Sequence, residues 1–369
     1  MDINDLLKMM VKHDASDLFF SANAPVGIKI EGTTRYMGDQ TLSAETIKKL
    51  AYGMMNDEQI RTFEAEMEMD LAFSNPEIGR YRVNVFRQRG DVAIVIRYIH
   101  RKIRTIADLN LPPILNDLVM SPRGLVLMVG AAGSGKSTTL ASMIDHRNQT
   151  RSGHILTIED PVEYLHTHKK SIVNQREVGF DTHSYGAALK RAMREAPDVI
   201  MIGEIRDRES MEQALMYSET GHLCLSTVHA ANANQTMERI TGFFPDYARK
   251  DILRDLSHHL RAIVAQRLLT GRNDKRIPAV ELLLNTPHVQ DLIQKGEIEK
   301  LKEAMEKGDE YGMSTFDQSL YELYHAKKIS LDEALTNADS KNNLGLRVRL
   351  EETGKPASSG PVSTSRAGH

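Results

Sequence analysis

The feature that most constrains the fold of this chain is a glycine-rich octapeptide that consists of Gly130, Ala131, Ala132, Gly133, Ser134, Gly135, Lys136 and Ser137. It matches the pattern G-x-x-x-x-G-K-[ST] at every fixed position. The apolar run Leu125–Val129 precedes the octapeptide, and the helical run Thr138–Asp145 follows it. A strand, a glycine-rich loop and a helix in this order predict a phosphate-binding loop, because the loop N–H groups and the helix N-terminus attract phosphate.

The predicted loop implies a nucleotide and a divalent cation as cofactors. Lys136 would reach the β- and γ-phosphates of ATP, and the Ser137 hydroxyl would bind Mg²⁺. We therefore expect the octapeptide and the next residue, Thr138, to form the nucleotide-binding site.

Strands and helices alternate along the chain from Leu125 onward, which is the pattern of a parallel sheet with crossover helices. The strand candidates are Leu125–Val129, Ile155–Glu159, Val199–Ile202 and Leu223–Thr227. Beyond about Asp246, helical patterns dominate through about Leu344. We therefore predict an α/β ATPase domain over residues 114–350 that ends in a helical C-terminal part.

The first hundred residues predict a separate, small α+β domain. Its candidate helices and strands are Asp2–His13, Ser43–Asn56 and Asp57–Glu66, and Leu18–Ser21, Gly27–Glu31, Tyr81–Arg87 and Asp91–Ile99. Gln88-Arg89-Gly90 separates the last two strands and is a hairpin signal. We assign residues 1–100 to this domain, the proline-containing segment 101–113 to a linker, and the Gly-, Ser- and Pro-rich residues 351–369 to a disordered tail.

The composition limits the class of partner. A formal net charge of −3 over 369 residues gives no indication of a nucleic-acid partner. The single cysteine, Cys224, excludes an internal disulfide and a zinc site made of several cysteines. No stretch approaches the roughly 18 apolar residues of a membrane helix. We therefore expect a cytoplasmic protein that does not insert into a membrane.

A carboxylate follows the strand Val199–Ile202. Glu204 stands at the carboxyl end of this strand, which is the edge where parallel sheets bind ligands. Many P-loop enzymes have an aspartate at the position of Gly203. Metal binding would therefore fall to Ser137, water and Glu204.

A second acidic segment, Glu159-Asp160-Pro161-Val162-Glu163, follows another short strand. Three carboxylates in five residues repel one another, so the cluster indicates a cation or a reaction that uses them. We predict that Glu163 is the general base that orients or deprotonates the attacking water. A solvated acidic turn is the alternative interpretation.

Two histidines, His222 and His229, bracket the run Leu223–Val228. If the run is extended at about 3.3 Å per residue, they stand roughly 20 Å apart and cannot both contact one phosphate. His229 is at the C-terminal end of the run, on the nucleotide edge. We predict that His229 senses the γ-phosphate.

These four segments, in this order and spacing, resemble the motifs of the secretion ATPase superfamily, which powers type II secretion and type IV pili. They read GAAGSGKST, TIEDPVEY, APDVIMIGEIRD and GHLCLSTVHAANA. The resemblance covers about residues 1–345 and implies a PAS-like N-terminal domain, a RecA-like ATPase domain and a ring of six subunits. By matching position, Arg82 and Arg97 would be the family's paired arginines, which close over the nucleotide and stabilise charge on its phosphoryl group.

The chain length and cysteine count are similar to those of the shorter, retraction branch of this family. The resemblance implies a motor of pilus retraction and twitching motility, peripheral at the inner membrane, with a PilT-like retraction ATPase and an inner-membrane platform protein as partners. The typical PilT segment A-I-R-N-L-I-R is replaced by residues 288–294, HVQDLIQ, and the usual Pro-Thr of the loop by Ala131-Ala132. Both departures favour an accessory retraction ATPase.

Two other classes of function stay open. A nucleotide-dependent adaptor would bind ATP and a partner motor but hydrolyse little. Intact Lys136, Glu163 and Glu204 favour the motor, and a phosphate-release assay separates the two. A nucleic-acid translocase of the RecA type is disfavoured by the near-neutral charge and the absence of tryptophan.

Overall fold

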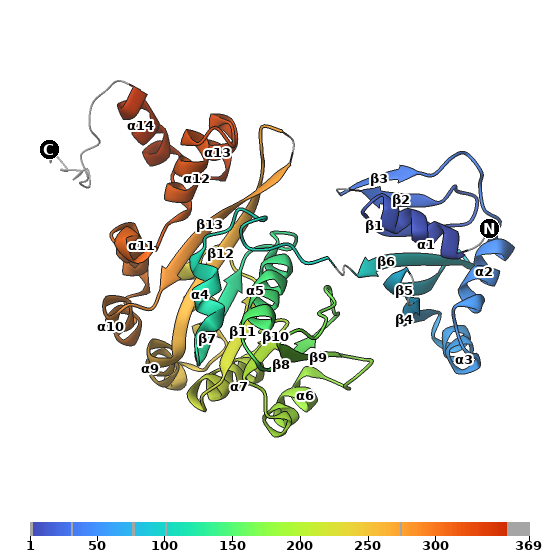
Figure 1. The fold of residues 1–369 in the computed structure, drawn as a ribbon, viewed down its shortest axis with the longest axis horizontal. Helices are drawn as coiled ribbons and strands as arrows, with labels where there is room; N and C mark the ends of the chain where they lie inside the picture. The colour runs from blue at the N-terminus through green and yellow to red at the C-terminus, as the bar shows by residue number, and fades with distance from the viewer. Residues whose placement is uncertain (1–2, 31, 76–77, 100–101, 274, 353–369) are drawn as a thin grey trace, which may run out of the picture. The chain divides into compact units, whose positions relative to one another are not determined.

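The computed structural model describes residues 3–30, 32–75, 78–99, 102–273 and 275–352. The chain divides into two compact units (Figure 1). Unit 1 comprises Met1–Lys102 together with Glu163–Leu165, and unit 2 comprises Ile103–Val162 and His166–His369. Each unit has its own sheet and its own hydrophobic core.

Unit 1 is built on a six-stranded antiparallel sheet in the order β3-β2-β1-β6-β5-β4. Its strands are β1 (Ala15–Phe20), β2 (Gly27–Ile30), β3 (Thr33–Tyr36), β4 (Glu68–Asn75), β5 (Gly79–Gln88) and β6 (Asp91–Ile99). Its helices are α1 (Ile3–Lys12), α2 (Ala44–Gly53) and α3 (Asp57–Glu66). Buried residues of all three helices share one core with the sheet, so the unit is a small α+β domain.

The residues of strand β5 alternate between the core face of the sheet and its other face. Tyr81, Val83 and Val85 are buried, whereas Arg82 and Asn84 between them are not. This alternation is typical of a strand with one face on a core. It places the predicted site residue Arg82 on the face away from the core.

The local signals in unit 1 are confirmed. The Ser43 side chain accepts a hydrogen bond from the Thr46 N–H at the start of α2, and Asn56 and Gln59 form a capping box at the start of α3. Residues 89 and 90 join β5 to β6 with positive φ angles of 53° and 88°, as in the two-residue turns that hairpins favour.

Two strands at the sheet edges are additional to those predicted. Strand β3 is exposed along its length and carries no apolar alternation. Strand β4 does alternate, because Met69, Leu71 and Phe73 are separated by other residues. The signal for β4 was therefore present in the sequence, directly after α3.

Unit 2 is built on a seven-stranded sheet in the order β13-β12-β7-β11-β10-β8-β9. Its strands are β7 (Gly124–Val129), β8 (Gly153–Glu159), β9 (Ser171–Glu177), β10 (Val199–Ile202), β11 (Leu223–Val228), β12 (Leu260–Thr270) and β13 (Arg276–Leu284). All neighbours are parallel except β12 and β13, which form an antiparallel pair. The predicted parallel strands therefore end at one common edge, where such sheets bind ligands.

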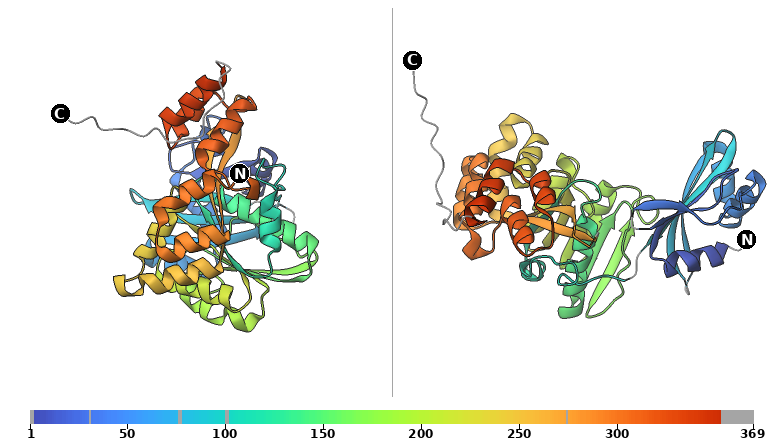
Figure 2. Two further views of the ribbon diagram at one scale, coloured as in Figure 1. Left: turned by 90° about the vertical axis from the view of Figure 1, so that its left-hand side faces the viewer. Right: turned by 90° about the horizontal axis from the view of Figure 1, so that it is seen from above.

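Helices cover both faces of this sheet (Figure 2). In β7, Leu125, Leu127 and Val129 face one core, and Val126 and Met128 face the other. Strands buried on both faces read as continuous apolar runs rather than as alternating patterns. The helices are α4 (Ile114–Met120), α5 (Lys136–Thr150), α6 (Tyr185–Ala192), α7 (Arg208–Glu219), α8 (Ala233–Gly242), α9 (Arg249–His259), α10 (Pro287–Lys295), α11 (Leu301–Glu306), α12 (Phe316–His325), α13 (Leu331–Asn337) and α14 (Lys341–Glu352).

The region beyond Asp246 differs from the prediction, because the pair β12–β13 lies where helical patterns were expected to dominate. Strand β12 is buried in its central part, 262–266, and periodicity alone cannot distinguish a buried strand from a buried helix. Pro278 is tolerated in β13 because this strand is at the sheet edge. The helical C-terminal part is present from α9 to α14, with α12 packed on β13 and α13 on β12.

The segment 101–113, expected as a linker, belongs largely to unit 2. The boundary between the units falls after Lys102, and Ile106 and Leu111 are buried in a core of unit 2. Apolar burial of this kind stabilises by about 1.5–3 kcal/mol for each large side chain. The segment therefore packs on unit 2 and is not a free linker. Asp2, the first residue of the candidate helix Asp2–His13, and tail residues 353–369 lie outside the described residues.

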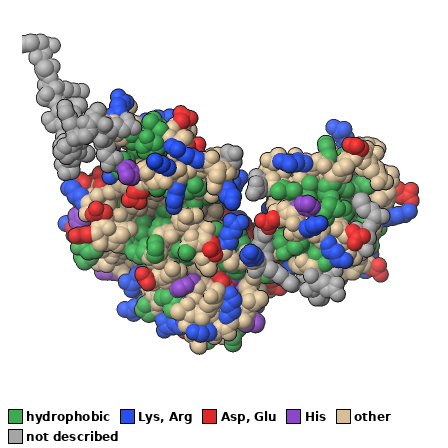
Figure 3. Space-filling model, turned by 45° about the horizontal axis from the view of Figure 1, so that its top comes forward, with side chains coloured by type: hydrophobic (Ala, Val, Ile, Leu, Met, Phe, Trp, Pro, Cys, Tyr) green, Lys and Arg blue, Asp and Glu red, His purple; other side chains and the backbone are tan. Residues whose placement is uncertain are grey.

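The helices and the surface charges are relevant to the predicted absence of membrane insertion and of a nucleic-acid partner. Among the described helices, none combines the length and apolar character needed to cross a membrane. Figure 3 shows basic and acidic side chains interspersed over the viewed face of each unit. This mixture agrees with the formal net charge of −3.

Candidate nucleotide-binding site

The glycine-rich loop lies between the end of β7 and the start of α5. Gly130, Gly133 and Gly135 have φ angles of 150°, 75° and 92°, in the region where glycine avoids the strain of a side chain. A Cβ on Gly130 would stand 2.6 Å from the main-chain oxygen of Gln266. Conformation and space therefore both require glycine at the first position of the loop.

Helix α5 begins at Lys136, directly after Gly135. The first N–H groups of an α-helix have no acceptor within the helix, so those of the first turn are available to an anion at the loop. The Lys136 Nζ donates hydrogen bonds to the main-chain oxygens of Gly130 at 2.8 Å and Ala131 at 2.9 Å. These bonds hold the ammonium group over the loop, where it can meet a phosphate.

A pocket of about 260 Å³ adjoins the loop. Its lining residues are Gly130, Ala131, Ala132, Gly133, Ser134, Ala231, Gln266, Arg267 and Leu268. The Ser134 Oγ is buried and has no hydrogen-bond partner within the described parts of the chain. Leaving a buried polar group unsatisfied costs about 1–3 kcal/mol. A phosphate oxygen accepting from this hydroxyl would remove that cost, so the loop fits a nucleotide.

Gln266 of β12 packs on the loop and on α5. Its side chain is buried, and its Oε1 accepts a hydrogen bond from the Thr139 hydroxyl at 2.8 Å. Its Nε2 lies 2.6 Å from the position that a Cβ of Gly135 would take. Gln266 was not among the predicted site residues, although a Gln-Arg pair inside the apolar run 262–269 is a signal, because buried polar side chains need partners.

Glu204 and His229 lie together at the ends of the adjacent parallel strands β10 and β11. The His229 Nε2 is 3.5 Å from the Glu204 Oε1, and the Arg206 Nε donates to the Glu204 Oε2 at 2.9 Å. The Glu204 side chain is only 17% exposed. The structure thus brings two predicted site residues together at the carboxyl edge of the sheet, with Arg206 as a third member that was not predicted.

The structure gives a reason for glycine at position 203. A Cβ there would lie 2.7 Å from the hydroxyl of Tyr185, the first residue of α6, and 3.3 Å from the Cα of Glu159. Burial, and then the negative charge of Asp160, raises the pKa of Tyr185. The hydroxyl therefore stays protonated and occupies the space that an aspartate side chain at position 203 would need.

Glu163 lies in an exposed position beyond β8. Glu159, the first carboxylate of the same segment, is buried and accepts hydrogen bonds from the Thr157 hydroxyl at 2.6 Å and the Gln175 Nε2 at 3.3 Å. The Glu159 carboxylate is thus held by hydrogen bonds within the chain, whereas the exposed Glu163 carboxylate is accessible to a water or a ligand. Its role as general base stays a prediction.

Arg82 and Arg97 are directly opposite each other on β5 and β6. The Arg97 Nε donates to the Asp17 Oδ1 at 2.8 Å, and an Arg82 guanidinium nitrogen donates to the Asp70 Oδ2 at 3.4 Å. Asp17 is buried, while the Arg97 side chain is 60% exposed. Each arginine thus has a carboxylate partner of its own, which offsets the repulsion between like charges opposite each other on a sheet. The role of this pair toward the nucleotide stays a prediction.

An Mg²⁺ ion at this site would have few protein ligands. Within the described ranges, no group of three His, Cys, Asp or Glu side chains could hold a metal ion. Mg²⁺ at nucleotide sites usually takes one or two protein ligands together with phosphates and water. Ser137, in the first turn of α5, fits this arrangement by its position, and the metal role of Glu204 stays a prediction.

Unit 2 is a P-loop nucleotide-binding domain. It has a mostly parallel sheet covered by helices, a glycine-rich loop between β7 and α5, and a pocket beside that loop. Residues 1–279 match the family described as Type II/IV secretion system protein. The chain is 48% identical over 351 residues to the type IV pilus ATPase PilU of Pseudomonas aeruginosa, which covers 95% of this chain and 92% of PilU. It is 39% identical over 343 residues to PilT of the same organism, covering 93% of this chain and 100% of PilT.

A solved structure extends the similarity to three dimensions. The crystal structure of the pilus retraction motor PilT with bound ADP has a TM-score of 0.87 and 39% identity, and covers 94% of this chain and 99% of that chain. The chain therefore belongs to the Type II/IV secretion system protein family, in the branch that contains PilU and PilT. The predicted fold, a PAS-like α+β domain with a RecA-like ATPase domain, is confirmed, and so is the prediction of a nucleotide-binding ATPase.

Proposed function

We propose that the chain is an ATP-hydrolysing motor of the type IV pilus machinery, which forms a homo-hexamer and assists pilus retraction in twitching motility. The observation that carries the proposal is a complete phosphate-binding loop in a chain 48% identical to the pilus ATPase PilU over 95% of its length. The motor would work beside a PilT-like retraction ATPase and on an inner-membrane platform protein, at the cytoplasmic side of that membrane.

The proposed roles follow from the chemistry of phosphoryl transfer. Lys136 and the loop bind the phosphates, and Mg²⁺, when bound, neutralises charge on them. Ser137 and, through water, Glu204 would hold the ion. Glu163 would orient or deprotonate the attacking water. His229, 3.5 Å from Glu204, would respond to the γ-phosphate by changing that contact.

The paired arginines complete the proposed site. Arg82 and Arg97 would supply positive charge to the transferring phosphoryl group, because a guanidinium is always charged and forms two parallel hydrogen bonds with phosphate. Their cross-strand pairing supports a joint role.

Replacing the loop lysine tests the proposal. Lys136→Ala should abolish tight ATP binding or turnover without unfolding the chain, because this side chain acts on phosphates. Lys250→Ala, which removes an exposed lysine of α9, is the matched control. Phosphate release and nucleotide binding are measured for both, with circular dichroism to verify the fold. Wild-type turnover by Lys136→Ala would exclude the site.

A nucleotide-dependent adaptor with little hydrolysis is the second candidate function, and one observation favours it. Position 203 has no carboxylate, and Glu204 is already paired with Arg206 at 2.9 Å. Phosphate release at saturating ATP separates the two functions. A motor turns over faster than its Glu204→Gln variant, whereas an adaptor binds ATP and releases phosphate no faster than that variant.

A further inference from the structure

The wall of the nucleotide pocket has two parts besides the glycine-rich loop. One is Ala231, in the turn between β11 and α8, and the other is Gln266–Leu268 of β12. Neither part belongs to the phosphate-binding loop, so other contacts must hold each of them in place. Gln266 is held by Thr139 of α5, whereas the contacts of Arg267 lead to the C-terminal helices.

Arg267 joins the β12 part of the wall to α12, α13 and the turn before α14. Its guanidinium donates to the main-chain oxygen of Asn337 at 2.7 Å and to the Asp339 Oδ1 at 2.7 Å. It also lies 3.8 Å from the centre of the Phe316 ring. A further hydrogen bond also joins β12 to α13, from the Thr270 N–H to the Glu333 Oε1 at 2.9 Å.

Asp339 is itself held from several sides. Its Oδ2 lies 3.7 Å from the Lys302 Nζ, and its N–H donates to the Asp317 Oδ1 at 2.8 Å. The Lys302 Nζ is also 3.8 Å from the Asp317 Oδ2. The Asp339 side chain is 18% exposed, and charges shielded from solvent are screened less than surface pairs. Arg267, Lys302, Asp317 and Asp339 therefore form one connected group, here called the Asp339 cluster.

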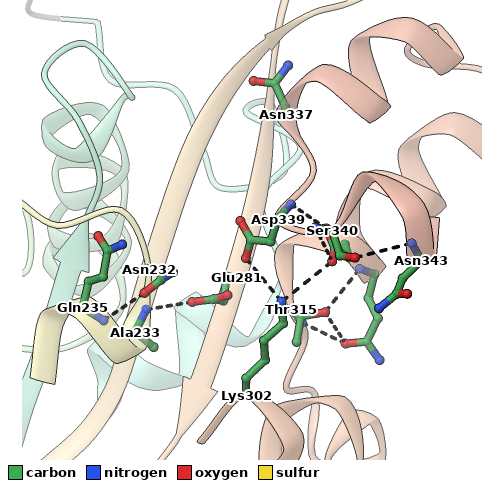
Figure 4. A network of polar contacts seen from close by, with 12 residues as sticks. Asn232, Ala233, Gln235, Glu281, Lys302, Thr315, Asn337, Asp339, Ser340 and Asn343 are labelled. Carbon is green, nitrogen blue, oxygen red and sulfur yellow. Dashed lines mark hydrogen bonds and ion pairs between the residues drawn. The ribbon is translucent and has the colours of Figure 1, made fainter. Parts of the chain in front are cut away.

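Glu281 of β13 lies between the other part of the wall and the same cluster. It is 2% exposed, and its Oε1 accepts a hydrogen bond from the Ala233 N–H at 2.8 Å. Ala233 begins α8, two residues after the wall residue Ala231. Figure 4 shows Glu281 between Ala233 on one side and Lys302 and Asp339 on the other. The β12 part of the wall is thus bonded directly to the C-terminal helices, whereas the Ala231 part is next to a bond to Glu281, which lies within the electrostatic reach of the same cluster.

We propose that Asp339 is a positioning residue of the nucleotide site, which fixes the pocket wall through Arg267 and makes nucleotide binding and the packing of α13 and α14 depend on each other. The proposal rests on the nucleotide site proposed above and adds to it a region outside all four ATPase motifs. Coupling between two sites is reciprocal. A contact that tightens nucleotide binding is therefore itself tightened by the nucleotide.

The first test is the affinity for nucleotide. Binding of a fluorescent ADP analogue to the full chain is measured for the wild type, Asp339→Ala and Asp339→Asn. We expect the dissociation constant to rise about fivefold or more for Asp339→Ala, the lower end of typical coupling between sites. Asp339→Asn keeps the shape but removes the negative charge that faces Arg267 and Lys302, so its dissociation constant should also rise; it tests the proposal if the alanine variant does not fold. Asp332→Asn, at an exposed carboxylate in the first turn of α13, is the matched control and should bind as the wild type does.

A double-mutant cycle tests whether Asp339 acts through Arg267. If it does, the double variant Arg267→Ala/Asp339→Ala binds no more weakly than Arg267→Ala alone, because the second substitution removes a contact already lost. Additive losses of affinity would overturn the proposed route.

Hydrogen exchange supplies a measurement that a purely structural role would not change. ADP should increase protection of the amides of α13 and α14 in the wild type and leave it unchanged in Asp339→Ala. If the wild type binds no ADP, the nucleotide site itself is wrong. If the wild type binds ADP and Asp339→Ala binds it equally well, the site stands and the positioning role is overturned.

Discussion

At the scale of single residues, Glu204 and Glu163 are the carboxylates that hydrolysis would use. Glu204→Gln and Glu163→Gln should retain ATP binding but slow hydrolysis by roughly a hundredfold or more, the scale of losses at general bases and phosphoryl sites. Single-turnover hydrolysis and nucleotide titration measure the two effects separately. Glu299→Gln, at an exposed position, is the control. An unchanged hydrolysis rate in either variant would remove its proposed role.

The close approach of Gly203 and Tyr185 leads to a prediction about stability. Gly203→Ala should lower the free energy of unfolding by about 1–3 kcal/mol, the typical cost of overpacking, because its Cβ would lie 2.7 Å from the Tyr185 hydroxyl. Tyr185→Phe in the same chain should recover most of the loss. Urea unfolding measures both changes. Gly242→Ala, where a Cβ meets nothing within 4 Å, is the control, and equal losses with and without the hydroxyl would contradict the explanation.

At the scale of elements, the hairpin β5–β6 carries two arginines whose charges face each other. Arg82→Ala and Arg97→Ala should each slow ATP hydrolysis. Arg82→Ala should change stability little, because its partner Asp70 is exposed to solvent, whereas Arg97→Ala should also lower stability, because it leaves the buried Asp17 without its countercharge. ATPase rate and thermal unfolding are the measurements. Arg35→Ala, on the exposed strand β3, removes the same charge from unit 1 and should leave the rate unchanged. Wild-type rates in both hairpin variants would falsify the assignment.

In strand β13, burial raises the pKa of Glu281 from 4.5 to about 7. The negative charge of Asp339 also raises this pKa. The hydrogen bond from the Ala233 N–H and the positive charges of Arg267 and Lys302 lower it. Between these two pKa values the folded chain holds a proton that the unfolded chain releases. The free energy of unfolding contributed by this group is therefore present below pH 4.5 and is lost as pH rises to about 7.

The variant Glu281→Gln isolates this contribution, because glutamine keeps the acceptor for the Ala233 N–H and cannot ionise. At about pH 8, Glu281→Gln should be more stable than the wild type by roughly 3 kcal/mol, the equivalent of the pKa shift. The difference between the two chains should disappear toward pH 4.5, the ordinary pKa of the group. Urea unfolding across this range measures it, and a pH-independent difference would show that Glu281 is not the titrating group.

At the scale of the whole molecule, helix α10 bears on the accessory role. The buried positions Val289, Leu292 and Ile293 keep the apolar character of the typical PilT segment. The two arginines of that PilT segment are replaced here by Gln290 and Gln294. The helix therefore keeps an apolar side and lacks two positive charges of that segment.

We expect deletion of the gene to weaken pilus retraction under load. We also expect that this chain alone does not restore retraction to a strain that lacks a PilT-like ATPase. Retraction force and twitching zones are the measurements, with a chain carrying Lys136→Ala as the control without ATPase activity. Full retraction by this chain alone would overturn the accessory role and leave the ATPase assignment unchanged.

Features that depend on a few neighbouring residues could be predicted from the sequence. The strand, loop and helix around Lys136 were predicted because glycine geometry and the helix start are local. The helix starts at Ser43 and Asn56 and the hairpin between β5 and β6 have the same local origin. The partial failure also has a physical reason, since the buried apolar run of β12 is compatible with both a helix and a strand.

Only the tertiary structure decided which distant residues complete the site. It placed Gln266 against Gly135 and Thr139, and Tyr185 above Gly203. It also connected Arg267, in the pocket wall, to Asp339. The sequence by itself determined the chemistry of the glycine-rich loop, because that chemistry lies in consecutive residues. The pocket wall and its connection to the C-terminal helices depend on sheet pairing between segments far apart in the chain, which no local pattern encodes.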